Sequence, residues 1–253
     1  MFAEERQREI LKMLKENGAV SASELMKRFG TSSETVRRDL SEMEKKRLLT
    51  RVHGGALLLP EMMKQTDLDY RTHSNYKEKK ELSKTAISTL KNGEAVFIDC
   101  GSTVICLAEA IAEKMEHLTV VTNSMDVFNI LNRAGRFEII LTGGLFRPEE
   151  NAFAGAIALS SLSKVHLNKA FIAPAAISLK SGIFDCGHEF MLLQQKVIES
   201  SNEVFIIADS EKFEKTALYK LSDTKAEYTY ITDSSLSDKV KAIYKENGIR
   251  ILN

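Results

Sequence analysis

The chain has 253 residues, of which 43% are hydrophobic and 28% are charged. This composition is typical of a folded globular protein and excludes a disordered or collagen-like chain. The formal net charge is zero, but residues 1–60 carry twelve basic and nine acidic side chains, against 23 and 26 in the remainder. A mildly basic N-terminal unit on an acidic body is consistent with a head that binds nucleic acid.

Segments for export or for membrane insertion are not evident. The first residues are charged, and no apolar run approaches the length of a membrane span. Cys100, Cys106 and Cys186 are odd in number and lack the spacing of metal ligands, so we expect three reduced, buried thiols. The sequence therefore predicts a cytoplasmic protein with no membrane contact, no metal and no cofactor.

Two short helices open the chain. Residues 1–17 are rich in helix formers, and Gly18 stands where such a helix would end. Ser21 and Glu24 have the spacing of a capping box, which predicts a second helix running to Phe29.

A third helix is predicted after the turn at Gly30. The hydroxyls of Thr31 and Ser32 can accept from N–H groups at its start, and Thr31 and Glu34 have the spacing of a capping box. One face of this helix is apolar, formed by Val36, Leu40 and Met43. The opposite face and its flanks carry hydroxyls and two adjacent arginines, which can bond phosphate oxygens and base edges. The alternative is an ordinary surface helix with a solvated charged face.

Residues 48–56 predict two short strands about a turn, which would form a wing beside the three helices. The arrangement is that of a winged helix-turn-helix. The candidate DNA-binding residues on the third helix and the wing are Ser32, Ser33, Thr35, Arg37, Arg38, Ser41, Arg51 and His53.

Two segments carry a family resemblance. TVRRDL at residues 35–40, followed by RVHGGA at residues 51–56, resembles the signature of the DeoR-type bacterial transcription regulators. A weaker match, R…N..EK, continues at Arg71, Asn75, Glu78 and Lys79. The resemblance implies a winged helix-turn-helix at residues 1–58, a linker at 59–76 and a sensor of sugar phosphates at 77–253.

The remainder alternates short apolar strands with helices, which predicts an α/β domain with a mainly parallel sheet flanked by helices. The expected strands are residues 95–99, 118–121, 137–141, 170–173, 203–208 and 228–231, with an edge strand at 249–252. The expected helices are residues 77–90, 104–114, 125–133, 156–165, 189–200 and 238–246.

Small and polar residues follow four of these strands, at the edge where parallel sheets bind ligands. Gly101, Ser102 and Thr103 open a helix, a position suited to phosphate, and Arg147 and Lys212 can neutralise an anion. The full candidate set for an effector is Asp99, Gly101, Ser102, Thr103, Thr122, Asn123, Ser124, Gly143, Gly144, Arg147, Asp209 and Lys212. For any one of them, a helix cap or a turn is the alternative explanation.

The same loops resemble those of the family, in which this half is similar to ribose-phosphate isomerases and binds a phosphorylated sugar. Residues 173–177 depart from the family pattern, which puts the fourth loop's contact with the ligand in doubt. Residues 184–189 correspond to a variable segment that we expect to read the sugar, with His188 starting a helix.

Two functions are compatible with these patterns. The first is a repressor, not an enzyme, which binds a double-stranded DNA operator as a homodimer or homotetramer and is released by a phosphorylated sugar or polyol. The second is a sugar-phosphate isomerase with an appended helical domain, in which Asp99 and Asp209 would act as bases. No nucleophile with a positioned base is evident, and an isomerase has no use for a wing.

Overall fold

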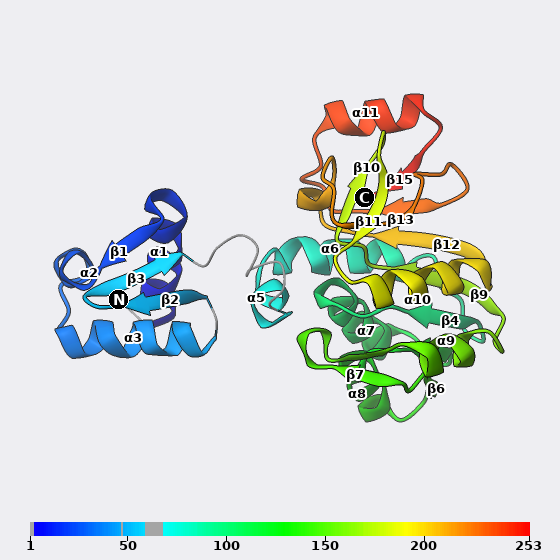
Figure 1. Ribbon diagram of the computed structural model, residues 1–253, viewed down its shortest axis with the longest axis horizontal. Helices are drawn as coiled ribbons and strands as arrows, with labels where there is room; N and C mark the ends of the chain where they lie inside the picture. Colours follow the sequence, from blue (N-terminus) through cyan, green and yellow to red (C-terminus); the bar gives the residue numbers. More distant parts are fainter. Residues whose placement is uncertain (1–2, 47, 59–67) are drawn as a thin grey trace. The chain divides into compact units, whose positions relative to one another are not determined.

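The computed structural model describes residues 3–46, 48–58 and 68–253 (Figure 1). The chain forms two compact units that meet between Ser74 and Asn75. We call the first unit the head and the second the body. Of the linker expected at 59–76, residues 59–67 lie outside the described residues, and its second part contains a short helix, α5 (Leu68–His73).

Within residues 3–46 and 48–58, the head combines three helices with a three-stranded antiparallel sheet (Figure 1). Its elements are α1 (Ala3–Asn17), β1 (Ala19–Ser21), α2 (Ala22–Phe29), α3 (Ser33–Lys45), β2 (Leu49–Val52) and β3 (Gly55–Leu58). The predicted three helices and two-stranded wing are confirmed. Strand β1, which pairs with β3, is an addition, because three residues are too few to show a strand period.

The apolar face predicted for α3 forms part of the head's core. Val36 and Met43 are fully buried and Leu40 is almost so. They pack with residues from the other helices and the sheet, including Ile10, Leu14, Leu25, Leu49 and Ala56. Burial of this one face leaves the other face of α3 at the surface.

The capping prediction is correct for α2, and for α3 it is correct for the Ser32 hydroxyl and wrong for the capping box. The Ser21 hydroxyl accepts a hydrogen bond from the Glu24 N–H, as expected. At α3 the cap is Ser32, which accepts from the Thr35 N–H, so the proposed pair of Thr31 and Glu34 is not the capping box. The N–H groups of Gly30 and Thr31 both bond back to the carbonyl of Met26, so these residues still close α2 and the start of α3 moves one residue along.

The body is organised around a seven-stranded sheet of order β15-β14-β12-β9-β4-β5-β6. All six neighbouring pairs are parallel, so every strand ends at the same edge of the sheet. The strands are β4 (Ala95–Ile98), β5 (Thr119–Thr122), β6 (Glu138–Leu141), β9 (Leu167–Ile172), β12 (Ser201–Ile207), β14 (Thr229–Ile231) and β15 (Arg250–Leu252). The expected parallel sheet, with its edge strand near residue 250, is confirmed.

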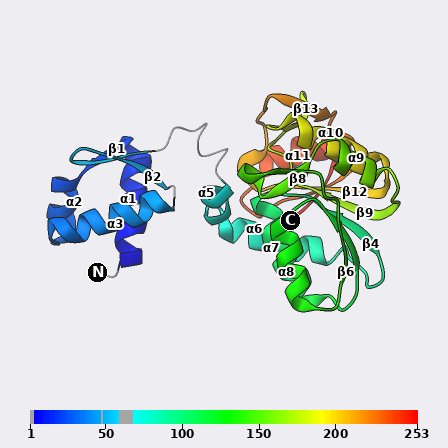
Figure 2. The same ribbon diagram turned by 60° about the horizontal axis from the view of Figure 1, so that its bottom comes forward.

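Helices cover both faces of this sheet (Figures 1 and 2). One face packs against α6 (Tyr76–Ile87), α7 (Ser102–Lys114) and α8 (Met125–Ala134), and the other against α9 (Ala156–Leu162), α10 (His188–Glu199) and α11 (Asp238–Glu246). Successive strand residues alternate between the faces: Val96 and Ile98 pack with the first group, and Phe97 packs with the second. Burial on both faces explains the continuous apolar runs in the sequence.

Small antiparallel pieces follow the ends of three sheet strands. After β6 comes the hairpin of β7 (Leu145–Arg147) and β8 (Ala152–Ala154). A second small sheet contains β10 (Ala176–Ser178) and β11 (Gly182–Asp185), which follow β9, and β13 (Tyr219–Ser222), which follows β12. Sequence patterns do not predict these strands, because each is only three or four residues long. Their insertion points all lie at the carboxyl edge of the main sheet.

Candidate functional site

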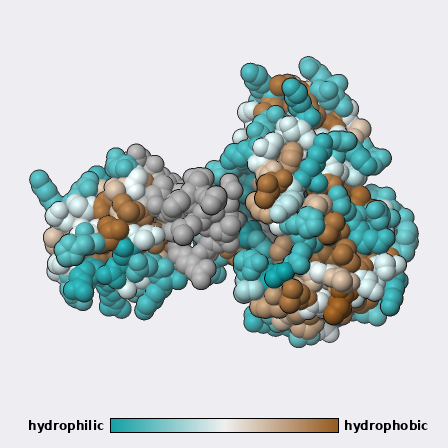
Figure 3. Space-filling view, in the orientation of Figure 1, coloured by the Kyte–Doolittle hydropathy of each residue, from teal (hydrophilic) through white to brown (hydrophobic). Residues whose placement is uncertain are grey.

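The outward face of α3 is the first candidate surface. Ser33, Arg37 and Arg38 are exposed, and Thr35 and Ser41 are half-buried on its flanks. The side chain of Arg38 is 81% exposed and approaches Glu42, one turn later, at 3.5 Å. The part of the head where α3 lies is mostly hydrophilic in Figure 3. A helix with one buried face and two exposed arginines is suited to contacts with an anionic polymer.

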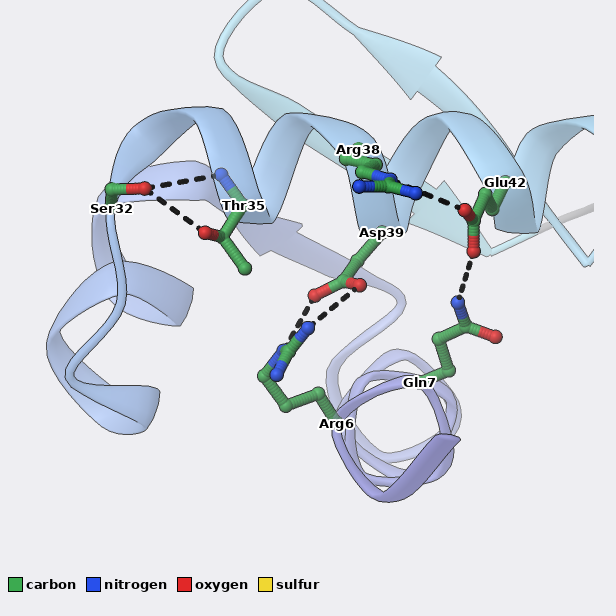
Figure 4. A network of polar contacts seen from close by, with 7 residues as sticks. All are labelled: Arg6, Gln7, Ser32, Thr35, Arg38, Asp39 and Glu42. Atoms are coloured by element: carbon green, nitrogen blue, oxygen red, sulfur yellow. Dashed lines mark hydrogen bonds and ion pairs between the residues drawn. The ribbon is translucent and has the colours of Figure 1, made fainter. Parts of the chain in front are cut away.

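The N-terminal turn of α3 is fixed by its own hydroxyls (Figure 4). Ser32 accepts from the Thr35 N–H at 3.3 Å, and the two hydroxyl oxygens lie 3.0 Å apart. Ser32 is therefore a helix cap, as the alternative explanation allows, and it remains exposed at the helix start.

An ion pair beneath α3 was not anticipated from the sequence (Figure 4). Asp39 accepts two hydrogen bonds from the Arg6 guanidinium, at 2.7 and 3.1 Å. Both residues are more than nine-tenths buried. Gln7 donates to Glu42 at 3.1 Å in the same contact between α1 and α3. The acid in TVRRDL therefore anchors the helix from inside, while the two arginines before it face outward. The sequence does contain a signal for this ion pair: helical spacing places the charged Asp39 on the inward face of the helix.

The wing presents the remaining two candidates, Arg51 on β2 and His53 in the turn, and both are exposed. The Arg51 N–H donates to Glu44 of α3 at 3.0 Å, so strand and helix are joined near the wing. Gly54 has a φ of 85°, which favours glycine, whereas a Cβ on Gly55 would lie 2.1 Å from the carbonyl oxygen of Val20. The eight DNA-binding candidates thus lie on two adjoining elements of the head.

The second candidate site is the carboxyl edge of the body's sheet. Strands β4, β5 and β6 are neighbours, so their end loops adjoin, and β9 separates β4 from β12. The strand order therefore brings the four predicted loops to one edge. The loop after β9, which departs from the family pattern, is held by protein contacts: the Ala173 N–H donates to Asp99 and the Ala175 N–H to the Phe184 carbonyl.

Asp99, at the end of β4, is 2% exposed and is surrounded by donors. It accepts from the backbone N–H groups of Cys100 (2.8 Å) and Ala173 (3.0 Å) and from the Gln194 side chain (3.0 Å). Burial raises the pKa of this carboxyl to about 7, against the effect of the two backbone hydrogen bonds. The contacts of Asp99 tie the ends of β4 and β9 to α10.

The start of α7 follows directly. Its N-cap is Gly101, with a φ of 102° and no side-chain cap, so Ser102 and Thr103 are helix residues and not caps. Both residues are more than nine-tenths buried. Backbone N–H groups at the start of this thirteen-residue helix, together with the two hydroxyls, form a site suited to phosphate.

The loop after β5 contains two structural hydroxyls and one amide. Ser124 caps α8 by accepting from the Val127 N–H, and Thr122 accepts from the Ser124 N–H. A helix cap therefore accounts for Ser124 and a turn accounts for Thr122. Asn123 is 1% exposed; its amide nitrogen donates to the Phe153 carbonyl at 3.1 Å.

The loop after β6 is shaped by packing. Gly143 and Gly144 both have positive φ, and a Cβ on Gly144 would lie 2.6 Å from the carbonyl oxygen of Ala154. Arg147, on β7, pairs with Glu189 of α10 at 2.5 and 2.7 Å. Its charge is therefore balanced within the protein, and the pair joins the β7–β8 hairpin to α10.

The loop after β12 carries Asp209 and Lys212. Asp209 is buried and accepts from the Glu211 N–H, starting the short helix η2 (Ser210–Lys212). Burial raises the pKa of Asp209, and the charges of Lys212 and Lys79 oppose that shift. Sequence analysis missed Asp233 at the end of β14, which is fully buried and accepts from both the N–H and the hydroxyl of Ser210.

The variable segment 184–189 reaches the same edge through α10. Asp185 accepts from the Gly187 N–H and from the Gln194 side chain. His188 begins α10, as expected, and its ring lies 5.3 Å from that of Tyr219. Cys186 is exposed, so the expectation of three buried cysteines is wrong for this residue, because it lies in the loop between β11 and α10; Cys100 and Cys106 are buried.

Within residues 3–46, 48–58 and 68–253, no group of three or more His, Cys, Asp or Glu side chains is arranged to hold a metal ion. The helices of these same residues include none that is long and apolar enough to cross a membrane.

Comparison with known proteins gives matches over both units. Residues 6–61 match the family described as the DeoR-like helix-turn-helix domain, and residues 74–234 match the DeoR C terminal sensor domain. The chain is 34% identical over 240 residues to the lactose phosphotransferase system repressor of Lactococcus lactis subsp. lactis, covering 94% of this chain and 93% of that one. It is 28% identical over 247 residues to the glycerol-3-phosphate regulon repressor of Escherichia coli (strain K12), covering 98% and 97%.

Among solved structures, ribose 5-phosphate isomerase A from Methanocaldococcus jannaschii matches 55% of each chain, with 14% identity and a TM-score of 0.43. The two family matches together take in the head and most of the body, and the sequence relatives align over nearly their full length. This chain therefore belongs to the DeoR family of transcriptional regulators.

Proposed function

We propose that the chain is a repressor of a carbohydrate-utilisation operon, which binds double-stranded operator DNA through its head and leaves it when a phosphorylated sugar or polyol binds the body. In this proposal residues 1–58 bind DNA, residues 59–76 form the linker and residues 77–253 bind the effector. The observation that carries the proposal is the two-sided character of α3. Arg37 and Arg38 are exposed on a helix whose inner face is fixed by Val36 and Asp39.

In the proposed complex α3 lies in the major groove and the wing contacts the adjacent backbone. Arg37 and Arg38 supply charge to phosphates and donors to guanine edges, while Ser33, Thr35 and Ser41 offer smaller donors. Arg51 and His53 on the wing add phosphate contacts. Ser32 acts through the shape of the helix start, since its oxygen already caps α3.

For the effector we propose that the phosphate binds at the start of α7, on the N–H groups and hydroxyls of residues 101–103, with Lys212 supplying a positive charge. Asn123, on the neighbouring loop, contacts the sugar or polyol portion. Lys212 is a better charge partner than Arg147, whose guanidinium is already paired with Glu189. The names of two relatives, a lactose phosphotransferase system repressor and a glycerol-3-phosphate regulon repressor, support a carbohydrate effector.

The proposed DNA-binding form is a homodimer or homotetramer acting in the cytoplasm, because paired half-sites are read by paired recognition helices. Exposed apolar side chains on β7 and α9 support a contact between subunits of this kind. Leu145, Phe146 and Ile157 are 55%, 45% and 67% exposed. Exposed apolar surface of this kind is typical of association sites.

The experiment that tests the proposal has two parts. Genomic fragments selected by the purified chain define the operator, and fluorescence anisotropy then gives its affinity from about 50 to 200 mM salt. With ~6 phosphates contacted per dimer, log K should fall against log salt with a slope near −5. A flat dependence would contradict the phosphate contacts.

The second part is a thermal-shift screen of phosphorylated sugars and polyols, in which a ligand specific to the folded state raises the melting temperature. A compound that raises it should also weaken operator binding. If no such compound does both, the proposed release by an effector is refuted.

A further inference from the structure

Three buried oxygen atoms of the body have no hydrogen-bond partner among the described parts of the chain. They are Asn123 Oδ1, Gln194 Oε1 and Thr232 Oγ1, and the three residues are at most 2% exposed. Asn123 and Thr232 directly follow β5 and β14, and Gln194 is bonded to Asp99 at the end of β4. All three therefore lie along the carboxyl edge of the sheet, where the effector is proposed to bind.

The orientation of the Gln194 amide is set by its surroundings. Its nitrogen donates one hydrogen to Asp99 at 3.0 Å and the other to Asp185 at 2.9 Å. When Asp99 is ionised, above about pH 7, the reverse orientation would leave the amide oxygen facing two acceptors. The nitrogen is thus fully used, and the oxygen can only accept.

A buried carbonyl oxygen without a donor is costly, so the fold retains such an atom against a free-energy penalty. Two of the three oxygens, those of Asn123 and Gln194, belong to amides that flank the loop of residues 99–103. Asn123 lies on the β5 side of this loop and bonds to the β7–β8 hairpin at Phe153, and Gln194 reaches Asp99 from α10. A ligand that satisfies both must bring hydroxyl or amine donors, in addition to the phosphate bound at the start of α7.

We infer that Gln194 is a specificity residue of the effector site: its side-chain oxygen accepts a hydrogen bond from a hydroxyl on the carbon chain of a phosphorylated sugar or polyol. This inference rests on the proposed function and deepens it. Gln194 also joins the variable segment at Asp185 to the phosphate loop at Asp99, so changes in that segment alter the position of the acceptor. The amide distinguishes one polyhydroxy compound from another, and it adds nothing to the binding of the phosphate itself.

The test uses the full chain and four probes, namely inorganic phosphate, glycerol 3-phosphate, ribose 5-phosphate and glucose 6-phosphate. Isothermal titration gives the preference of each variant, defined as the Kd of inorganic phosphate divided by that of the best organic phosphate. Gln194→Lys keeps donors for both carboxylates but removes the acceptor, and Gln194→Met removes both. We expect the preference to fall about tenfold in each, with the affinity for inorganic phosphate not reduced.

Gln195→Met is the matched control. Gln195 is the next residue of α10, half-buried, and its amide donates to the Leu221 carbonyl. This variant should keep the wild-type preference. Circular dichroism verifies folding, and should Gln194→Met fail to fold, Gln194→Lys decides the result.

The role of Gln194 and the nature of the effector are tested by different outcomes. A wild-type preference that Gln194→Lys retains would overturn the role of Gln194 and leave the proposed function in place. A wild-type chain that binds none of the organic phosphates more tightly than inorganic phosphate would overturn the sugar-phosphate effector, and this inference with it.

Discussion

The candidate residues of the head and of the body sit in opposite environments. In the head, Arg37, Arg38 and Arg51 are exposed, and the guanidinium groups of Arg38 and Arg51 approach single carboxylates at 3.5 and 3.7 Å. In the body, Asp99, Asn123 and Asp209 are nearly or fully buried, and most of their hydrogen-bonding atoms are already used by the protein. The first site presents charge on a surface, and the second holds polar groups inside the fold.

This difference follows from the size of the two partners. A DNA duplex is larger than the head and can be contacted only from outside, so its binding groups must project into solvent. A small metabolite is enclosed, so the groups around it must be buried and held in place by their neighbours. Substitutions in the outward face of α3 should therefore reduce binding without loss of stability, whereas substitutions at the sheet edge should affect both.

The largest effect is expected where the head also depends on a buried charge. Asp39→Ala removes the buried carboxylate that accepts two hydrogen bonds from the Arg6 guanidinium, which should lower the free energy of unfolding by about 3–5 kcal/mol. The double variant Arg6→Met, Asp39→Leu should recover most of this loss. Glu44→Ala, which removes the half-buried carboxylate that pairs with Arg51 and accepts its N–H, should cost about 1 kcal/mol. Urea unfolding followed by circular dichroism measures all three, and equal effects would contradict the buried anchor.

The next effect concerns the pH dependence of the body. The pKa of Asp99 rises from 3.8 to about 7 on folding because the carboxyl is buried, so the folded chain retains a proton that the unfolded chain releases. The stabilisation is complete below about pH 4 and is lost as the pH rises to about 7, at about 1.4 kcal/mol per pH unit. Asp99→Asn should flatten this slope, and the exposed control Asp238→Asn should keep it. If Asp99→Asn keeps the wild-type slope, the raised pKa of Asp99 is refuted.

A smaller effect is expected on DNA. Arg38→Ala should weaken operator binding by about 1–3 kcal/mol, roughly tenfold to a hundredfold, while the melting temperature stays close to that of the wild type. Arg133→Ala on α8 removes an exposed arginine of the body and serves as control. Anisotropy with the selected operator provides the comparison. Unchanged affinity in Arg38→Ala would remove α3 from the interface.

The smallest effect is expected on effector affinity, from the loss of one positive charge in the body. Lys212→Ala should weaken effector binding by about tenfold, through loss of one charged contact to phosphate, and should leave operator affinity intact. Lys215→Ala removes an exposed lysine three residues later and should behave as wild type. Titration calorimetry with the effector from the screen measures both. Identical affinities in the two variants would take Lys212 out of the site.

Local patterns were sufficient for much of the architecture. The face of Val36, Leu40 and Met43 follows from helical spacing, and the parallel sheet follows from apolar runs that alternate with helices. Patterns failed where a turn moves a boundary by one residue or an element is very short. Gly30 and Thr31 still close α2, so Ser32 caps α3, and the strands of the small antiparallel sheets are too short to show a period.

The sequence by itself determined the two units, the outward arginines of α3 and the polar loops after the strands, because each is encoded within a few neighbouring residues. Only the tertiary structure decided which polar groups are already engaged. Asp39 meets Arg6 across 33 residues, Arg147 meets Glu189 across 42, and Gln194 meets Asp99 across 95. A hydrogen-bonding side chain is available to a ligand only if the fold has not satisfied it, and that depends on neighbours that periodicity and spacing do not reveal.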